Sequence, residues 1–156
     1  MLTSSEKKDY ILRMIEQMRR LVEALLGKLR EGLETQPDLA EAHGVLASLL
    51  GPLTAIAPRM DSATAGQMVG DAGILEAWAE LTAAEAELAQ ARGNQAAAGA
   101  SRRRALELAL EAHLRTNTDH AALLALVARL RPFVDASTLA PRHAEALGGV
   151  RAAAGG

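Results

Sequence analysis

The chain has 156 residues, and its 17 Lys+Arg against 19 Asp+Glu give a formal net charge of −2. This length fits one domain that buries roughly 68–70% of the unfolded surface, and the lack of cysteine excludes disulfides, thiolate metal sites and cysteine nucleophiles. The near-neutral charge and the scarcity of aromatic residues argue against a nucleic-acid partner and against a carbohydrate site.

The sequence predicts neither a leader nor a membrane span. The first residues, Met1 to Glu6, lack the basic and then apolar order of a signal peptide. The longest apolar run, Ala121 to Ala128, is far shorter than the ~20 residues that a span requires. We therefore expect a cytoplasmic protein with no membrane partner.

Composition predicts an all-α fold class. Ala, Leu, Glu and Arg dominate the sequence, and all four are strong helix formers. Valine, isoleucine and the aromatic residues, which favour strands, are scarce. We expect a single all-helical domain over residues 1–156.

The longest predicted helix occupies the first segment, residues 1–32. Thr3 and Glu6 form a capping box, in which the hydroxyl and the carboxylate satisfy free amides of the first turn. A helix from about residue 4 to residue 31 would be roughly 40 Å long, and Gly32 is suited to end it. Its apolar residues follow a 4-3-4-3-4 spacing at Ile11, Ile15, Met18, Val22, Leu25 and Leu29.

This apolar stripe has two interpretations. It packs on the rest of its own domain, or it binds a partner helix, including the helix of a second copy. A length of roughly 40 Å exceeds the diameter of a small helical domain, so one end could project. A projecting apolar end would favour a homodimer through the first helix.

Residues 36–73 are predicted to hold a second helix and a connector. The segment from Thr35 to Asp38 begins the helix, and Gly51-Pro52 ends it. The rest, residues 51–73, contains several Pro and Gly residues, and Asp61-Ser62 open one short helix there. The apolar residues of this stretch favour a connector over a domain boundary.

Residues 74–115 are predicted to form a helical hairpin, and residues 118–153 a C-terminal helix pair. The hairpin helices run from about Ile74 to Ala91 and from about Gln95 to Arg115, with Gly93 in the turn. The last two helices span about 119 to 130 and about 141 to 153. The hairpin residues predicted to face inward are Leu75, Trp78, Leu81, Leu88, Ala98, Ala105, Leu106, Ala109 and Leu110.

The hairpin resembles one tetratricopeptide repeat. Trp78 and Leu81, the turn residue Gly93, and then Ala98 and Ala105 stand at positions of that motif. The first helix is about one turn longer than in the motif, and the proline that closes a repeat is absent. The resemblance implies hairpins stacked in a tetratricopeptide-like right-handed array, with a protein or peptide partner.

A second resemblance lies near the N-terminus. The run from Tyr10 to Glu16, Tyr-Ile-Leu-Arg-Met-Ile-Glu, is similar to the opening of an uncharacterised bacterial family of small helical proteins, a domain of unknown function with a tetratricopeptide-like hairpin downstream. The resemblance extends from residue 8 to about residue 133. It implies a helical fold and transfers no catalytic residue.

The histidines suggest no metal site. None belongs to a pair one helical turn apart, and acids two positions from a histidine, as in Glu111 and His113, point to a different helix face. His113 and His120 flank a turn and could approach each other. We expect surface or capping histidines, with no metal and no cofactor. The histidines are His43, His113, His120 and His143.

The acidic residues of the predicted helix 74–91 are expected to form a solvated face. Glu76 and Glu80 are one turn apart, as in di-iron bundles, but such sites require Glu-x-x-His pairs that the sequence lacks. Glu85 and Glu87 continue the same helix and are expected to be solvated as well.

Arg102-Arg103-Arg104 form the one dense charge cluster. Consecutive helical residues are about 100° apart, so three arginines cannot all face one phosphate. Arg103 and Arg104 could flank a groove that recognises an anion or an acidic peptide, while Arg102 pairs with a neighbouring acid. Ordinary surface solvation is the alternative.

Two functions follow from these observations. The first is a non-enzymatic helical interaction module, which binds a protein or peptide partner or self-associates through its first helix. The second is a small-molecule or anion binder, or an enzyme, whose pocket among the helices uses Arg103, Arg104, His113 and His120. No catalytic set is recognisable in the sequence, so we expect no enzyme.

Overall fold

The computed structural model describes residues 3–116 and 120–153, and within them the chain forms seven α-helices and no strand. The predicted all-α fold class is confirmed; the tetratricopeptide-like arrangement stays a prediction. The helices are α1 (Ser4–Arg30), α2 (Gln36–Leu50), α3 (Ser62–Val69), α4 (Ala72–Ala91), α5 (Gln95–Leu114), α6 (Ala121–Leu130) and α7 (Pro141–Ala153). Short 3-10 turns occupy Gly51–Leu53, Ala57–Arg59, Arg131–Phe133 and Ala136–Thr138.

Local signals set both ends of α1. The Thr3 hydroxyl accepts a hydrogen bond from the Glu6 amide, and the Glu6 carboxylate accepts one from the Thr3 amide, which completes the predicted capping box. Gly32, just beyond the C-cap residue Glu31, has a φ of 73°, a left-handed conformation that favours glycine.

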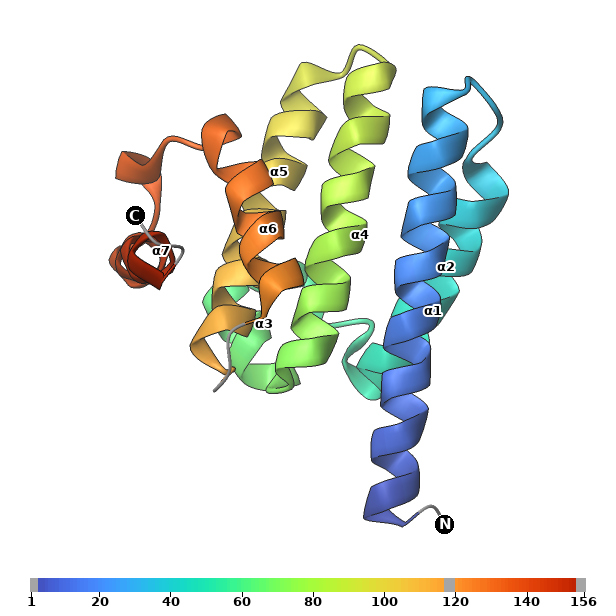
Figure 1. Cartoon of the computed structure of the whole chain (residues 1–156), viewed down its shortest axis with the longest axis horizontal. Helices are drawn as coiled ribbons and strands as arrows, with labels where there is room; N and C mark the ends of the chain where they lie inside the picture. Colours follow the sequence, from blue (N-terminus) through green and yellow to red (C-terminus); the bar gives the residue numbers. More distant parts are fainter. Residues whose placement is uncertain (1–2, 117–119, 154–156) are drawn as a thin grey trace.

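Most of α1 packs on its own domain. It contacts α2 and α4, and its predicted stripe supplies buried residues such as Met18 and Leu25. The N-terminal end does not follow this pattern, because it extends past the other helices (Figure 1). The packing interpretation therefore holds for the rest of the stripe, and the predicted projection of one end is confirmed.

Helices α4 and α5 form the most extensive helix pair in the fold. Asp71 and Asn94 cap their N-termini through side-chain hydrogen bonds, and Gly93 makes the turn with a φ of 77°. Helix α4 begins two residues before the predicted position because the Asp71 side chain caps its N-terminus. All the residues predicted to face inward from this hairpin are buried.

The remaining helices pack around the hairpin. Helix α3 lies against α5, and α6 and α7 also pack on α5 (Figure 1). One continuous cluster of buried apolar side chains extends from Ile15 in α1 to Val150 in α7. No helix in the described part of the chain combines the length and apolar character that crossing a bilayer requires.

Candidate functional site

A groove of about 950 Å³ lies where α1 projects beyond the fold. The N-terminal half of α1 forms one wall, with Lys7, Lys8, Ile11 and Leu12 among its residues. The first turns of α4 and the residues just before α6 form the other wall. We call this feature the α1 groove.

The groove exists because α4 begins level with the middle of α1. A Cβ atom at Gly73 would lie only 2.9 Å from Ile15 Cδ1, so the two helices are in close contact at this point. From Ile15 back to Ser4, α1 continues for roughly 16 Å at 1.5 Å per residue. The apolar stripe reaches this end through Ile11, which is half-buried, and the next residue, Leu12, lies outside the stripe and is 54% exposed.

Glu76 lies at the inner wall of the α1 groove, and its side chain is only 4% exposed. Its Oε2 accepts a hydrogen bond of 3.0 Å from Arg19 Nη2. Its Oε1 lies 3.4 Å from His120 Nδ1, a contact whose angles do not make a hydrogen bond, and it accepts none from any described residue. Glu76 is thus a buried carboxylate with one oxygen hydrogen-bonded and the other, itself buried, paired with His120 but without a hydrogen bond from a described residue.

The prediction of a solvated acidic face was wrong for Glu76. Helix α4 is the central helix, and it contacts α1, α5 and α6, so few of its positions reach solvent. Glu80 and Glu85 are half-buried and pair with Arg129 and His43, while Glu87 is exposed as expected. Burial raises the pKa of Glu80 and of Glu85 above their ordinary values.

The structure separates the two histidines that were considered together. His120 stands at the N-cap of α6 beside Glu76. The His113 side chain, in the last turn of α5, is half-buried and forms no hydrogen bond or ion pair with a described residue. Residues 117–119 of the turn between them lie outside the described residues. No group of three potential ligands suited to a metal ion occurs in the described ranges.

The three arginines are engaged within the fold. Arg102 contacts Gln90 and lies over the Phe133 ring, 4.0 Å from its centroid, rather than pairing with an acid as expected. Arg103 contacts Thr138 and lies 3.8 Å from Glu107. These contacts attach α5 to the turns that precede α7. Anion binding by Arg103 stays a prediction.

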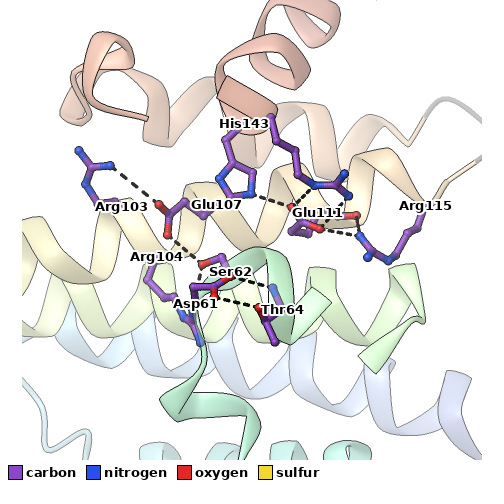
Figure 2. A network of polar contacts seen from close by, with 10 residues as sticks. Asp61, Ser62, Thr64, Arg103, Arg104, Glu107, Glu111, Arg115 and His143 are labelled. Atoms are coloured by element: carbon purple, nitrogen blue, oxygen red, sulfur yellow. Dashed lines mark hydrogen bonds and ion pairs between the residues drawn. The ribbon is translucent and has the colours of Figure 1, made fainter. Parts of the chain in front are cut away.

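Arg104 joins α5 to the first residue of α3 and to the 3-10 turn before it (Figure 2). Its guanidinium donates hydrogen bonds to Ser62 Oγ at 2.9 Å and to the Ala57 carbonyl at 3.3 Å, and it lies 5.1 Å from the centroid of the Trp78 ring. Burial lowers the pKa of Arg104 from its ordinary value, although a guanidinium stays charged at neutral pH. Anion binding by Arg104 likewise stays a prediction.

A buried ionic cluster around Glu111 was not predicted (Figure 2). The Glu111 side chain is fully buried and contacts Arg115 Nη1 at 2.7 Å, Arg142 Nε at 2.9 Å and His143 Nε2 at 2.7 Å. Burial alone would raise the pKa of Glu111, but hydrogen bonds from Arg142, Arg115 and His143 outweigh it and lower that pKa. The cluster joins α7 to α5.

The expectation of a surface or capping histidine was wrong for His143, which is buried against Glu111. The histidine that contacts Glu111 is His143 from α7 rather than His113 on its own helix. One signal was present in the sequence, since Glu111 stands between Leu110 and Ala112 in a run of inward-facing residues. A carboxylate in such a place requires hydrogen-bonding partners.

The α1 groove and the Glu111 cluster therefore have different chemical capacities. Both oxygens of the buried Glu111 carboxylate accept hydrogen bonds within the chain, whereas the groove is open and is lined by Glu76, whose Oε1 accepts none from a described residue. Comparison with protein-family models, with curated proteins and with solved structures finds no match to this chain. Its function is accordingly inferred from the geometry of its own residues.

Proposed function

We propose that this chain is a non-enzymatic, cytoplasmic helical interaction module that self-associates through the projecting end of α1. The observation that carries the proposal is the continuation of the apolar face of α1 beyond the fold. Leu12, which lines the α1 groove, is 54% exposed on this end, and Tyr10, on the other side of the helix, is 40% exposed. A large exposed apolar side chain at a groove is typical of interaction surfaces.

The charges on this end of α1 favour a second copy as the occupant of the groove. Lys8, Leu12 and Glu16 stand one helical turn apart on the same face. If two α1 helices pair antiparallel with Leu12 at the two-fold axis, Lys8 of each copy faces Glu16 of the other. The surface is then complementary to itself, with an apolar centre and two ion pairs around it.

The same residues have little role in stabilising one copy. Glu16 is 57% exposed and lies 3.5 Å from Arg19, a surface ion pair that contributes little to stability. Lys7 and Lys8 form no ion pair with any described residue. The run that resembles the bacterial helical family, Tyr10 to Glu16, lies on this projecting end. We also propose that the hairpin formed by α4 and α5 is tetratricopeptide-like.

The alternative of a small-molecule or anion binder has less support. Of its four candidate residues, only His120 lines the α1 groove. Arg103 and Arg104 have partners within the fold, and His113 stands on a different element from His120. No observation brings the four side chains to one cavity.

Sedimentation equilibrium over a range of concentrations tests the proposal. The wild-type chain is expected to form a dimer, and Leu12→Glu to be monomeric, because the substitution places two carboxylates at the two-fold axis. Leu33→Glu is the matched control, since Leu33 is also 54% exposed but lies beyond the C-terminal end of α1. It should dimerise as the wild type does. A wild-type chain that is monomeric at every concentration would overturn the proposal.

A further inference from the structure

We propose that Glu76 is the acceptor for a lysine ammonium group supplied by the second copy, and that Lys7 is this lysine. The inference rests on the proposed self-association and deepens it, because it names a polar contact between the two copies in addition to the apolar contact between their α1 helices. Each groove would then be completed by a residue of the other copy.

The first step concerns Glu76 Oε1, an oxygen that is itself buried. Buried polar atoms are nearly always hydrogen-bonded, and a carboxylate oxygen without a hydrogen bond in a low-dielectric site is costly. Glu76 Oε1 accepts no hydrogen bond from a described residue, although Arg19 satisfies Oε2 of the same carboxylate. Its neighbour at 3.4 Å, the His120 imidazole, is 45% exposed and lines the α1 groove, so a donor that enters the groove would reach this oxygen by displacing that imidazole.

The second step is the nature of the donor. A carboxylate gains most from a cationic donor. A lysine ammonium is a compact charge on a flexible four-carbon stem, so it can reach an acceptor at the inner wall of a groove. Lys7 lines the groove and forms no ion pair with a described residue, so its ammonium is available to another chain.

The third step is the register. Lys7, Ile11 and Ile15 stand one turn apart along the flank of α1 that meets α4. A two-fold axis at Leu12 brings like flanks of the two helices together, and it places residue 7 of one copy level with residue 17 of the other.

From that level, Glu76 lies within reach of the second copy's lysine. Arg19, whose guanidinium contacts Glu76 Oε2 at 3.0 Å, stands less than one turn of about 5.4 Å further along α1. A lysine stem can span this distance. Lys8 faces Glu16 in the same register, which leaves Lys7 as the donor to Glu76.

The dimer dissociation constants of two variants test this contact. Glu76→Gln and Lys7→Met should each weaken the dimer by about tenfold, as expected for one partly buried ion pair. The double variant should be no weaker than either single variant, because both remove the same contact.

Two matched controls keep the test specific. Glu80→Gln changes the next acid along α4, which pairs with Arg129 and does not line the groove. Lys28→Met changes a lysine that pairs with Asp38 at the other end of α1. Both controls should dimerise as the wild type does. Thermal unfolding of each variant establishes that it is folded.

Zero-length carbodiimide cross-linking gives a direct second measurement. The reagent joins a carboxylate to an amine in contact with it, and a mixture of unlabelled and ¹⁵N-labelled chains identifies products between copies. The inference predicts a Lys7–Glu76 cross-link with mixed labelling. A wild-type dimer whose affinity is unchanged by Glu76→Gln and Lys7→Met, and which lacks this cross-link, would overturn the inference and leave the proposed function standing. A wild-type chain that stays monomeric would overturn both.

Discussion

Two buried carboxylates on adjacent helices, Glu111 on α5 and Glu76 on α4, have opposite surroundings. Glu111 is enclosed by two guanidinium groups and an imidazole of its own chain. Glu76 has one guanidinium hydrogen bond, and its other oxygen, buried beside His120 at the wall of a groove, accepts none from a described residue. The difference indicates that a buried carboxylate with both oxygens hydrogen-bonded stabilises the fold, whereas one with a single hydrogen-bonded oxygen beside a groove can take a further donor.

The largest effect expected from this comparison concerns the two acids themselves. Glu111→Gln should lower the free energy of unfolding by about 3 kcal/mol, because it leaves the arginines of a buried cluster without their counter-charge. Glu76→Gln should cost no more than about 1 kcal/mol, because its partner Arg19 is 39% exposed and can be solvated. Urea denaturation measures both. Equal losses would contradict the distinction.

Substitution of the histidine beside each acid should also change the free energy of unfolding to different extents, by less than substitution of Glu111. His143→Ala should cost about 2 kcal/mol, since it removes a buried hydrogen-bond partner of Glu111 and leaves a cavity. His120→Ala should change stability by less than about 0.5 kcal/mol, because the His120 side chain is 45% exposed. If His120→Ala lowered the free energy of unfolding more than His143→Ala, the contact of His120 with Glu76 Oε1 would be stronger than its length of 3.4 Å indicates.

Space beside Glu111 provides a third test. A Cβ atom at Gly66 would lie 2.7 Å from Glu111 Oε1, so Gly66→Ala should displace the carboxylate and cost about 1–2 kcal/mol. Gly44→Ala is the matched control, because Gly44 is also within a helix but has no atom within 4 Å of the added Cβ. It should stabilise the chain by about 0.5–1 kcal/mol through helix propensity. Thermal unfolding compares the two; a tolerated alanine at position 66 would contradict the tight enclosure of Glu111.

The smallest expected effect is the pH dependence of the stability that Glu111 contributes. The pKa of Glu111 is lower in the folded chain than its ordinary value of 4.5, so the ionised cluster contributes its full stability above that pH. As the pH falls below 4.5, the unfolded chain takes up the proton first, and the contribution is lost as the pH passes through the lower folded value. The stability difference between wild type and Glu111→Gln should therefore shrink in this range, as followed by urea midpoints. A constant difference from pH 7 to pH 3 would contradict the lowered pKa.

The sequence predicted what local rules determine. The capping residues Thr3 and Asp61 and the turn residue Gly93 act within a few positions of themselves, so the helix boundaries beside them followed from the sequence. The cap Asp71 was missed, and α4 begins two residues earlier than predicted. Apolar spacing likewise predicted the buried faces of α1, α4 and α5.

The surroundings of the two acids depend instead on tertiary packing. Arg19 and Glu76 are 57 positions apart, and His143 and Glu111 are 32 positions apart. Helical periodicity contains no information on which residues meet across such separations. The burial of Glu76 follows from where α4 begins relative to α1, which no local pattern specifies.

Reversal of the two charges on the projecting end of α1 tests the proposed self-association most directly. Lys8→Glu and Glu16→Lys should each be monomeric alone, because like charges then face each other twice across the two-fold axis. Mixed in equal amounts, the two variants should form a heterodimer in which both pairs are again of opposite charge, as detected by sedimentation or by native mass spectrometry. Two variants that each dimerise alone, or that stay monomeric when mixed while the wild type dimerises, would contradict the antiparallel α1 pairing.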